Sequence, residues 1–277
     1  MKSICKSAAA VAALLLAPTA SAALITFEAA GANAAAITPT RDAFRAAVGG
    51  GTTAGANGSF GGLRREINWD GVPNAFADPS ALPADFFNVN SPRGAVFSTP
   101  GTGFLVSANA GQASPVLFGF PNDFQAFSAQ RLFTAVGSNI TDVSFFVPGT
   151  TTAATTSAFA AIFVDVEVAG LTTMEFFDQS GSSIFSRDVL VGGNQGLSFL
   201  GAVFDAGEPI SRVRLTSGLN TIVANGVLGN SNDDVVVMDD FLYAEPSRAV
   251  PEPSGLTLAG LGLLAGLSWP RRRRQDA

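Results

Sequence analysis

Between residues 115 and 245 the chain is built of short segments in which apolar and polar positions alternate. In "AIFVDVEV", at 161–168, Ile and Val occupy the even positions while Asp165 and Glu167 fall on the other face. A repeat of two residues is typical of a half-buried strand. Similar segments, separated by polar turns, predict strands at 140–147, 172–178, 182–191, 197–205, 210–217 and 234–243. Seven or more short strands with little helix predict an all-β protein, an antiparallel β-sandwich of jelly-roll type.

The first half of the chain is less regular. "ALITFE", at 23–28, predicts a short strand, and "TPTRDAFRAAVGGG" predicts one short helix with Thr40 as its N-cap and Gly49 as its terminator. Residues 50–115 are rich in Gly, Pro, Asn and Ser, so we expect mostly long loops there. Brief strands are predicted within this region at 95–98 and 103–107.

The N-terminus has the pattern of a secretory signal peptide. Lys2 and Lys6 precede an apolar run at 8–17, and small residues ending at Ala22 follow it. The alternative is a retained membrane anchor, but the run is shorter than the roughly 20 residues that a spanning helix needs. We therefore expect signal peptidase to remove residues 1–22 and an exported domain to extend over 23–249.

The C-terminus has a second apolar segment, at about 254–270, which consists mainly of Leu, Ala and Gly. As a helix it would measure roughly 25 Å, against a hydrocarbon core of roughly 30 Å. Arg271, Arg272, Arg273 and Arg274 follow directly, and such a cluster stays on the cytoplasmic side of a membrane. The alternative, a buried core helix, would have to accommodate four adjacent guanidinium groups at its end. The pattern favours a transmembrane helix that leaves the preceding domain outside the cytoplasm.

Residues 250–277 also resemble a known sorting signal. Pro251, Glu252 and Pro253, the apolar segment and the arginine cluster occur in the order found in the PEP-CTERM signal of Gram-negative bacteria. The resemblance implies a substrate of an exosortase, a membrane protease that processes the chain and delivers it to the cell surface or the extracellular matrix. It also implies an association with exopolysaccharide production and biofilm matrix. It concerns the destination of the protein and not its activity.

The domain itself resembles a set of exported bacterial proteins to which no activity is attached. The similarity rests on "LRREINWDGVP", "FSAQRLFTAVGSNITDVSFFVPG", "GLSFLGAVFDAGEPISRVRLTSG" and "DVVVMDDFLYAEP". These segments span most of residues 60–246. The resemblance supports export and implies nothing about chemistry.

Composition excludes several function classes. The chain contains no His, and its one Cys, Cys5, lies in the predicted signal peptide. A Ser-His-Asp triad, a Cys-His pair, an ordinary zinc site and a disulfide framework are therefore excluded for the exported domain. That domain has ten Arg, no Lys and twenty acidic residues, a net charge of −10. Nucleic acid and anionic membrane surfaces are thus not expected partners.

An acidic region near the end of the domain is a candidate site for a structural calcium. Asp233 and Asp234 in "GNSNDDVVVMDDFLY" supply carboxylates, and Asp240 lies in the last predicted strand. Jelly-roll sugar-binding modules often hold calcium between their first and last strands, and Glu28 with Asp240 resembles that placement. Calcium takes six to eight oxygen ligands. The alternative is a solvated turn with carboxylates hydrogen-bonded at a sheet edge.

Two further features are candidates for contact with sugars. Trp69 and Asp70, in "REINWDGVP", place an aromatic ring beside hydrogen-bonding groups, although a Trp here is also typical of a packed core edge. Arg212 and Arg214 share one strand face and suit an acidic sugar or a sulfate, or alternatively the carboxylates of the sandwich itself. If either feature binds a ligand, we expect that ligand to come from an extracellular polysaccharide, but the packed core edge for Trp69 and the sandwich carboxylates for Arg212 and Arg214 are the favoured alternatives.

No residue is assigned a catalytic role from the sequence. Asp239 and Asp240 are neighbours in a predicted strand, so we expect their side chains to point to opposite faces and not to form a glycosidase pair. A pair with Asp165, Glu167 or Asp70 stays open. Two function hypotheses result: a non-catalytic matrix or carbohydrate-binding module, and a carboxylate-dependent polysaccharide hydrolase.

Overall fold

The computed structural model describes residues 24–114, 116–204, 209–223, 226–228 and 234–248. The predicted cleavage site at Ala22, Asp233, Pro251, Glu252, Pro253, the apolar segment 254–270 and Arg271, Arg272, Arg273 and Arg274 lie outside these residues. Within the described ranges, no helix has both the length and the apolar character needed to cross a membrane.

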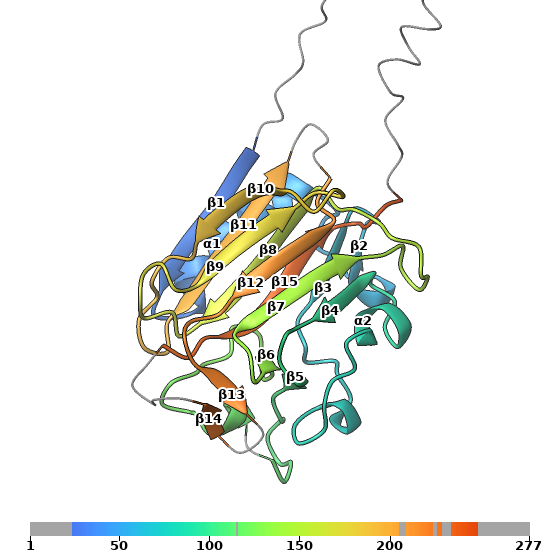
Figure 1. Ribbon diagram of the computed structural model, residues 1–277. Helices are drawn as coiled ribbons and strands as arrows, with labels where there is room; N and C mark the ends of the chain where they lie inside the picture. The colour runs from blue at the N-terminus through green and yellow to red at the C-terminus, as the bar shows by residue number, and fades with distance from the viewer. Residues whose placement is uncertain (1–23, 115, 205–208, 224–225, 229–233, 249–277) are drawn as a thin grey trace, which may run out of the picture.

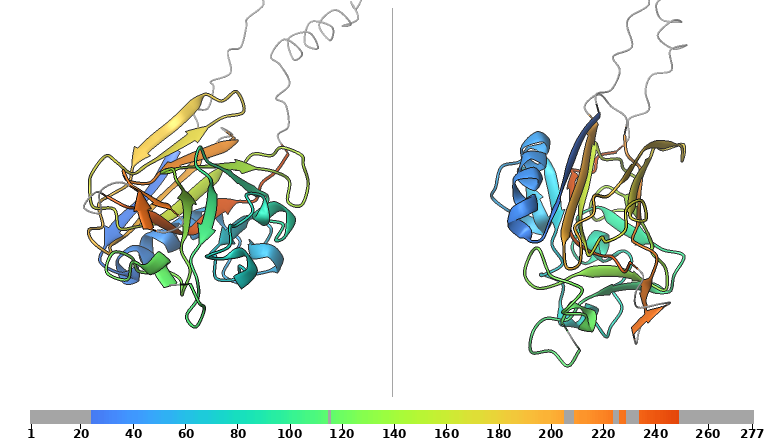
Figure 2. Two further views of the ribbon diagram at one scale, coloured as in Figure 1. Left: turned by 60° about the horizontal axis from the view of Figure 1, so that its bottom comes forward. Right: turned by 90° about the vertical axis from the view of Figure 1, so that its left-hand side faces the viewer.

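The described chain forms two facing β-sheets, which confirms the all-β sandwich (Figure 1; Figure 2, right). The larger sheet has ten strands. Its main path runs β1 (Leu24–Gly31), β11 (Leu197–Phe204), β8 (Ala158–Val164), β15 (Val237–Ala244), β6 (Phe133–Val136), β13 (Thr221–Val223) and β14 (Gly226–Leu228). Beside this path, β3 (Arg64–Ile67) pairs with β15 and β2 (Ser59–Phe60), and β5 (Gly103–Val106) pairs with β6.

The second sheet has five strands in the order β10 (Ser183–Asp188), β9 (Thr173–Phe177), β12 (Arg212–Thr216), β7 (Ile140–Phe145) and β4 (Ala95–Ser98). The strand pairs are antiparallel apart from one parallel bridge, between Ile222 of β13 and Val136 of β6. The predicted turn between β9 and β10 is present, because the Gly181 N–H donates to the Asp178 carbonyl at 3.2 Å.

One long helix, α1 (Ala34–Val48), lies on the outer face of the larger sheet (Figure 2, right). It ends at Gly49 as predicted, but it begins six residues before Thr40, with Asn33 Oδ1 accepting from the Ala35 N–H at 3.1 Å. Pro39 lies inside the helix, where it removes one backbone donor. The helix nevertheless continues through Pro39, because Ile37 before it and Phe44 after it are fully buried against the sheet. Shorter helices are α2 (Phe86–Val89) and 3₁₀ turns at Ala56–Gly58, Asn74–Phe76 and Val116–Gly119.

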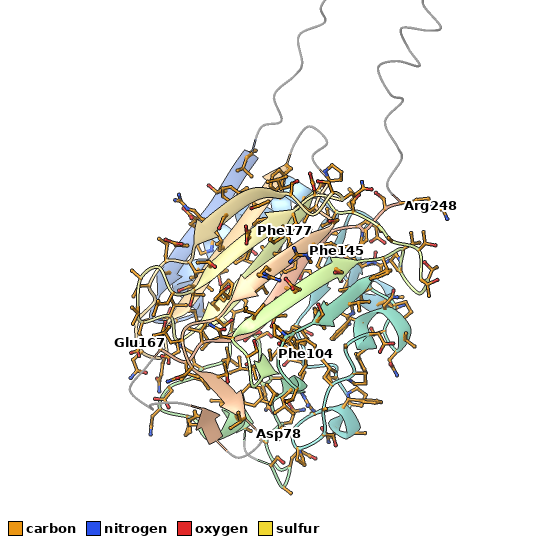
Figure 3. The ribbon with its side chains drawn as sticks, viewed as in Figure 1. Asp78, Phe104, Phe145, Glu167, Phe177 and Arg248 are labelled. Carbon is orange, nitrogen blue, oxygen red and sulfur yellow. The ribbon has the colours of Figure 1, made fainter. Side chains whose placement is uncertain are left out.

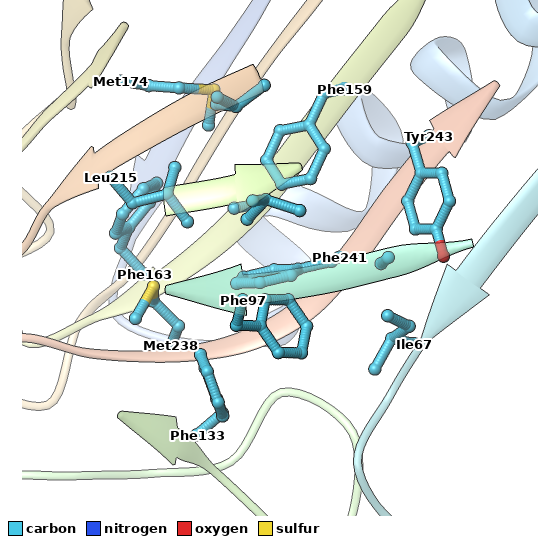
Figure 4. Close-up of a cluster of buried hydrophobic side chains, with 14 of the residues drawn as sticks. Ile67, Phe97, Phe133, Phe159, Phe163, Met174, Leu215, Met238, Phe241 and Tyr243 are labelled. Carbon is cyan, nitrogen blue, oxygen red and sulfur yellow. The ribbon is translucent and has the colours of Figure 1, made fainter. Parts of the chain in front are cut away.

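The sheet that carries α1 has a core on each face. Along β8, Phe159 and Phe163 point into the core between the sheets (Figure 4), while Ala160 and Ile162 point toward α1. All seven residues of β8 are buried. The prediction of a half-buried strand over 161–168 is therefore wrong in two respects: the strand ends at Val164, and the odd-numbered face, which was expected to be polar, points into the core between the sheets.

Residues 50–115 contain more strand than we predicted. The strands at 95–98 and 103–106 are confirmed, but β2 and β3 were missed. In β3, Arg64 and Glu66 are buried, at 1% and 9% exposure. Charged residues at buried positions hide the alternation on which strand prediction depends, and here an ion pair between them replaces apolar packing.

Candidate functional site

A β-bulge in β15 determines the position of two aspartates. Met238 pairs with Phe163 and Phe241 pairs with Ala161, so Asp239 and Asp240 together oppose the single residue between those partners. Met238 and Phe241 both point into the core between the sheets (Figure 4). Both aspartates therefore lie toward the α1 face. Our expectation that they point to opposite faces is wrong, because a bulge adds one residue to the alternation.

The two carboxyl groups converge on Ser128. Ser128 Oγ lies 3.1 Å from Asp239 Oδ1 and 2.9 Å from Asp240 Oδ1, and Asp239 Oδ2 accepts from the Phe127 N–H at 2.6 Å. Asp239 is fully buried and Asp240 is 5% exposed. Burial, followed by the charge of Asp240, raises the pKa of Asp239 well above its usual range, and burial also raises the pKa of Asp240. The pair therefore keeps a proton at pH values where an ordinary aspartate is ionised.

Asp240 lies at the edge of a cavity of about 610 Å³ between α1, β2, β3 and the Phe127–Ser128 segment. A second hollow of about 700 Å³ shares Arg41, Arg45 and Phe60 with it, and a third of about 250 Å³ shares Asn68 and Arg93. Hollows that share lining residues adjoin one another. We call these three hollows, which run from α1 to the segment beside α2, the α1 groove.

A network of ion pairs forms one side of the α1 groove. Glu66 accepts from Arg45 at 2.8 Å (Nε) and 2.6 Å (Nη2), and from Arg64 Nε at 2.7 Å. Burial alone lowers the pKa of Arg45, but its bonds to Glu66 outweigh this effect and raise it. Arg41 pairs with Asp42 at 2.7 Å and lies 5.0 Å from the Phe127 ring. Each of these three arginines thus has a carboxylate partner.

Arg93 differs from the other groove arginines. Its Nη1 donates to the Glu66 carbonyl and its Nε donates to Ser91 Oγ at 3.1 Å, while the guanidinium lies 5.1 Å from the Phe87 ring. Among the described residues it forms no ion pair with a carboxylate. Burial, together with the nearby charge of Arg65, lowers its pKa. The groove therefore contains a largely buried cation whose charge no carboxylate balances.

Trp69 is not a platform for sugar stacking. It is 1% exposed, its ring stacks on Phe133 at 4.0 Å, and its Nε1 donates to the Asp239 carbonyl at 2.7 Å. The core alternative is the correct one, because the ring lies beneath the bulge on the inner side of the sheet. Asp70 is also engaged: its Oδ1 accepts from the N–H groups of Gln130 (2.7 Å) and Arg131 (3.1 Å).

Arg212 and Arg214 share one face of the second sheet, as predicted, but both bind Asp142 of the neighbouring strand. The distances are 2.7 Å from Arg212 and 2.8 Å from Arg214. Burial raises the pKa of Asp142, but the bonds from Arg214 and Arg212 outweigh it and lower the pKa. The Arg212 guanidinium also lies 3.7 Å from the centre of the Phe177 ring; Phe177 is labelled on the second sheet in Figure 3. These arginines therefore neutralise a carboxylate of the sandwich itself, which is the alternative to ligand binding that the sequence left open.

Of the residues predicted to hold calcium, the three that the structure describes, Glu28, Asp234 and Asp240, are not brought together. Glu28 pairs with Arg187 at 2.5 Å and is three strands from Asp240, roughly 14 Å. Asp234 instead accepts from the Glu167 N–H at 3.0 Å. In the described part of the chain, no three acidic side chains are grouped as a metal site requires. The first strand is an edge strand beyond β11, so it does not neighbour the last strand as we expected.

The remaining hydrolase partners do not pair with Asp240 either. Asp165 follows β8 with φ 72°, and its Oδ1 accepts from the Gln195 N–H at 2.8 Å. Burial raises the pKa of Asp165 to about 7. Glu167 is exposed at the loop end of the sandwich (Figure 3). Neither residue lines the α1 groove.

The chain matches no known protein-family model and no curated protein. The candidate site therefore rests on the geometry of the α1 groove. Sequence reasoning missed its main residues, although Arg41 and Arg45 lie four apart in "TRDAFRAA", a spacing that places both on one helix face. Glu66 and Arg93 had no such signal, because only tertiary contacts bring them there: Glu66 of β3 binds Arg45 of α1, and Arg93 binds the Glu66 carbonyl.

Proposed function

We propose that the chain is an exported protein that an exosortase-type system delivers to the cell surface or the extracellular matrix. The predicted signal peptide ending at Ala22 supports export by way of signal peptidase. Pro251, Glu252 and Pro253, the apolar segment and the arginine cluster support a transient inner-membrane anchor and later processing. In this proposal the sandwich works outside the cytoplasm.

We also propose that the sandwich is of jelly-roll type. From β7 to β12, successive strands alternate between the two sheets, apart from the β9–β10 hairpin. The orders β10-β9-β12-β7 in one sheet and β11-β8-β15-β3 in the other support this topology. A jelly roll hosts many functions, so the function has to be argued from the site.

Within this frame the protein acts as a non-catalytic module that binds extracellular polysaccharide in the α1 groove. The observation that carries the proposal is the extent of the groove: three adjoining hollows suit a chain of sugars better than one small molecule. Its lining combines the rings of Phe60 and Phe127 with hydrogen-bonding groups of Asn68 and Ser128. Such a mixture of apolar faces and positioned polar groups is typical of ligand sites.

Cosedimentation of the purified full chain with the extracellular polysaccharide of the producing bacterium tests this function. We expect binding, and we expect Asn68→Ala to weaken it several-fold because the Asn68 side chain is exposed at the groove. The matched control is Gln179→Ala, which removes an exposed amide from the β9–β10 turn. Absence of cosedimentation with that polysaccharide would contradict the proposal.

A second candidate function, polysaccharide hydrolysis, is favoured by the protonated pair at the groove. Asp240 lines the groove, and its raised pKa is a property of a general acid. The same tubes can be assayed for reducing ends. Release that disappears in Asp240→Asn would establish a hydrolase, whereas binding without release leaves the non-catalytic module.

A further inference from the structure

The α1 groove concentrates positive charge in an acidic domain. Four of the ten arginines of the domain, Arg41, Arg45, Arg64 and Arg93, line its hollows. With a net charge of −10 over residues 23–250, the domain as a whole repels polyanions. Any affinity for an acidic polymer therefore has to come from a local site such as this groove.

The acids that line the groove repel an anion only weakly. Glu66 is held by two guanidinium groups, Arg45 and Arg64, so its charge is balanced inside the network. Asp240 shares a proton with Asp239, which reduces the negative charge of the pair. Among the charged groups of the described residues that line the hollows, Arg93 is the one without an opposite charge beside it.

The surroundings of Arg93 leave part of its guanidinium free. Nη1 and Nε are occupied by the Glu66 carbonyl and Ser91 Oγ, and no hydrogen bond from Nη2 is found within the described residues. Placing a cation in a partly buried site without a counter-ion is unfavourable, and an anionic ligand offsets that cost. Arg93 and Asn68 line both the 610 Å³ and the 250 Å³ hollows, so both residues lie where these two hollows adjoin.

We propose that the α1 groove selects an acidic polysaccharide, and that Arg93 binds the carboxylate of a uronic acid unit at the junction of the two hollows. This inference rests on the proposed polysaccharide binding and names the ligand class of the same site. The Asn68 amide is positioned to hydrogen-bond the same sugar unit. A guanidinium suits a carboxylate because its N–H donors lie in one plane and it stays charged.

The first arm of the test varies the ligand. Binding of the purified full chain to polygalacturonate is compared with binding to its carboxyl-reduced, neutral form, which keeps the sugar chain and removes the charge. We expect the acidic form to bind at least about tenfold more tightly, as for a charge-assisted hydrogen bond, and to weaken with added salt. Equal binding of the two forms would overturn the proposal while leaving polysaccharide binding intact.

The second arm varies the protein. Arg93→Gln should lose about tenfold in affinity for polygalacturonate and nothing for the carboxyl-reduced polymer, and Arg93→Lys should keep part of the preference. Arg214→Gln is the matched control, since it removes the same charge from the second sheet. A loss in Arg214→Gln with none in Arg93→Gln would place the anion site on the other sheet and refute ours.

Two outcomes distinguish a failure of the proposed polysaccharide binding from a failure of the carboxylate assignment. If neither polymer binds, and the polysaccharide of the producing bacterium does not bind either, the proposed function fails. If dextran sulfate binds and polygalacturonate does not, the site recognises sulfate and the carboxylate assignment is wrong. Thermal melts show whether Arg93→Gln is folded, and if it is not, the comparison of the two polymers decides the question with the unaltered chain.

Discussion

Asp165 shows how a single buried acid makes stability depend on pH. Asp165 is 5% exposed, and burial raises its pKa to about 7. The negative charges of Glu167, Asp123 and Asp234 add to this rise. The unfolded value is near 4. Between about pH 4 and pH 7 the folded chain keeps a proton that the unfolded chain releases, so this residue lowers stability progressively as pH rises through that window.

Asp165→Asn should remove this loss. Asn accepts the same hydrogen bond from the Gln195 N–H and tolerates the left-handed φ of 72°. We expect the variant to gain about 2 kcal/mol over the natural chain at pH 8, allowing for solvent screening, and almost nothing at pH 4. Thermal melts at both pH values measure the difference. Asp178→Asn is the control of opposite sign, because hydrogen bonds from Ser180 and Ser182 lower the pKa of Asp178.

At the scale of one element, the bulge in β15 organises the segment that covers it. Asp239 accepts hydrogen bonds from the N–H groups of Phe127 and Ser128, and Asp70 accepts from those of Gln130 and Arg131. Two aspartates thus hold five consecutive residues of a loop against the sheet. The groove wall at Phe127 and Ser128 depends on these bonds.

Asp239→Ala should free the Phe127–Ser128 segment from the sheet. The change leaves the Phe127 and Ser128 N–H groups without their acceptor and should destabilise the chain by about 2 to 3 kcal/mol. Asp239→Asn keeps a hydrogen-bond acceptor and cannot ionise, so we expect this variant to lose much less stability than Asp239→Ala above neutral pH. Urea unfolding at pH 8 gives both values. Equal losses of unfolding free energy in the two variants would show that these hydrogen bonds do not account for the stability that Asp239 contributes.

The close packing of α1 against the larger sheet depends on one glycine, Gly201. A Cβ built on Gly201 of β11 would lie 2.8 Å from Phe44 Cδ2 and 2.8 Å from Ala160 Cβ. Phe44 packs edge-on against Phe27 and Phe199 and has little room to move. The absence of a side chain at 201 therefore allows the helix to approach the sheet.

Gly201→Ala should lower stability by about 1 to 3 kcal/mol, because the core under α1 would be overpacked. Gly71→Ala is the control: nothing lies within 4 Å of its added Cβ and its φ is not positive, so we expect a change within about 0.5 kcal/mol. Urea midpoints compare the two variants. A neutral Gly201→Ala would mean that α1 shifts freely on the sheet.

At the scale of the whole molecule, β8, β11 and β15 lie between two cores. The core between the sheets contains Phe159 and Phe241, and the core under α1 contains Ile162 and Leu242. All residues of β8 and β15 are buried, whereas β10 at the edge of the second sheet is largely exposed. The three central strands should therefore open only when the whole domain unfolds.

Hydrogen exchange of the full chain, followed by mass spectrometry, tests this arrangement. We expect the slowest amides in β8 (Ala158–Val164) and in the adjoining parts of β11 and β15, with β10 (Ser183–Asp188) exchanging much earlier. The opposite order would mean that the smaller sheet, and not the sheet under α1, is the stable centre of the fold.

Much of the fold could be predicted because strands depend on local pattern. Ten predicted segments became strands of the sandwich, and Gly49 ended the helix as expected. The errors have physical causes. Thr40 suggested a helix start, but the helix begins six residues earlier, where Ile37 is buried against the sheet, and the charged residues of β3 concealed a buried strand. The site was predicted poorly, since Trp69 proved to be core and Arg212 and Arg214 are bound to Asp142.

The sequence by itself determined the all-β class, the exclusion of His and Cys chemistry and the expectation of export, since these follow from local periodicity, residue counts and the pattern of the two ends. The tertiary structure alone decided which residues meet. The bulge that turns Asp239 and Asp240 to one face depends on the pairing of β15 with β8, and the α1 groove depends on how a helix, β3 and the Arg93 segment pack together. Such contacts join residues distant in the chain, and no local pattern encodes them.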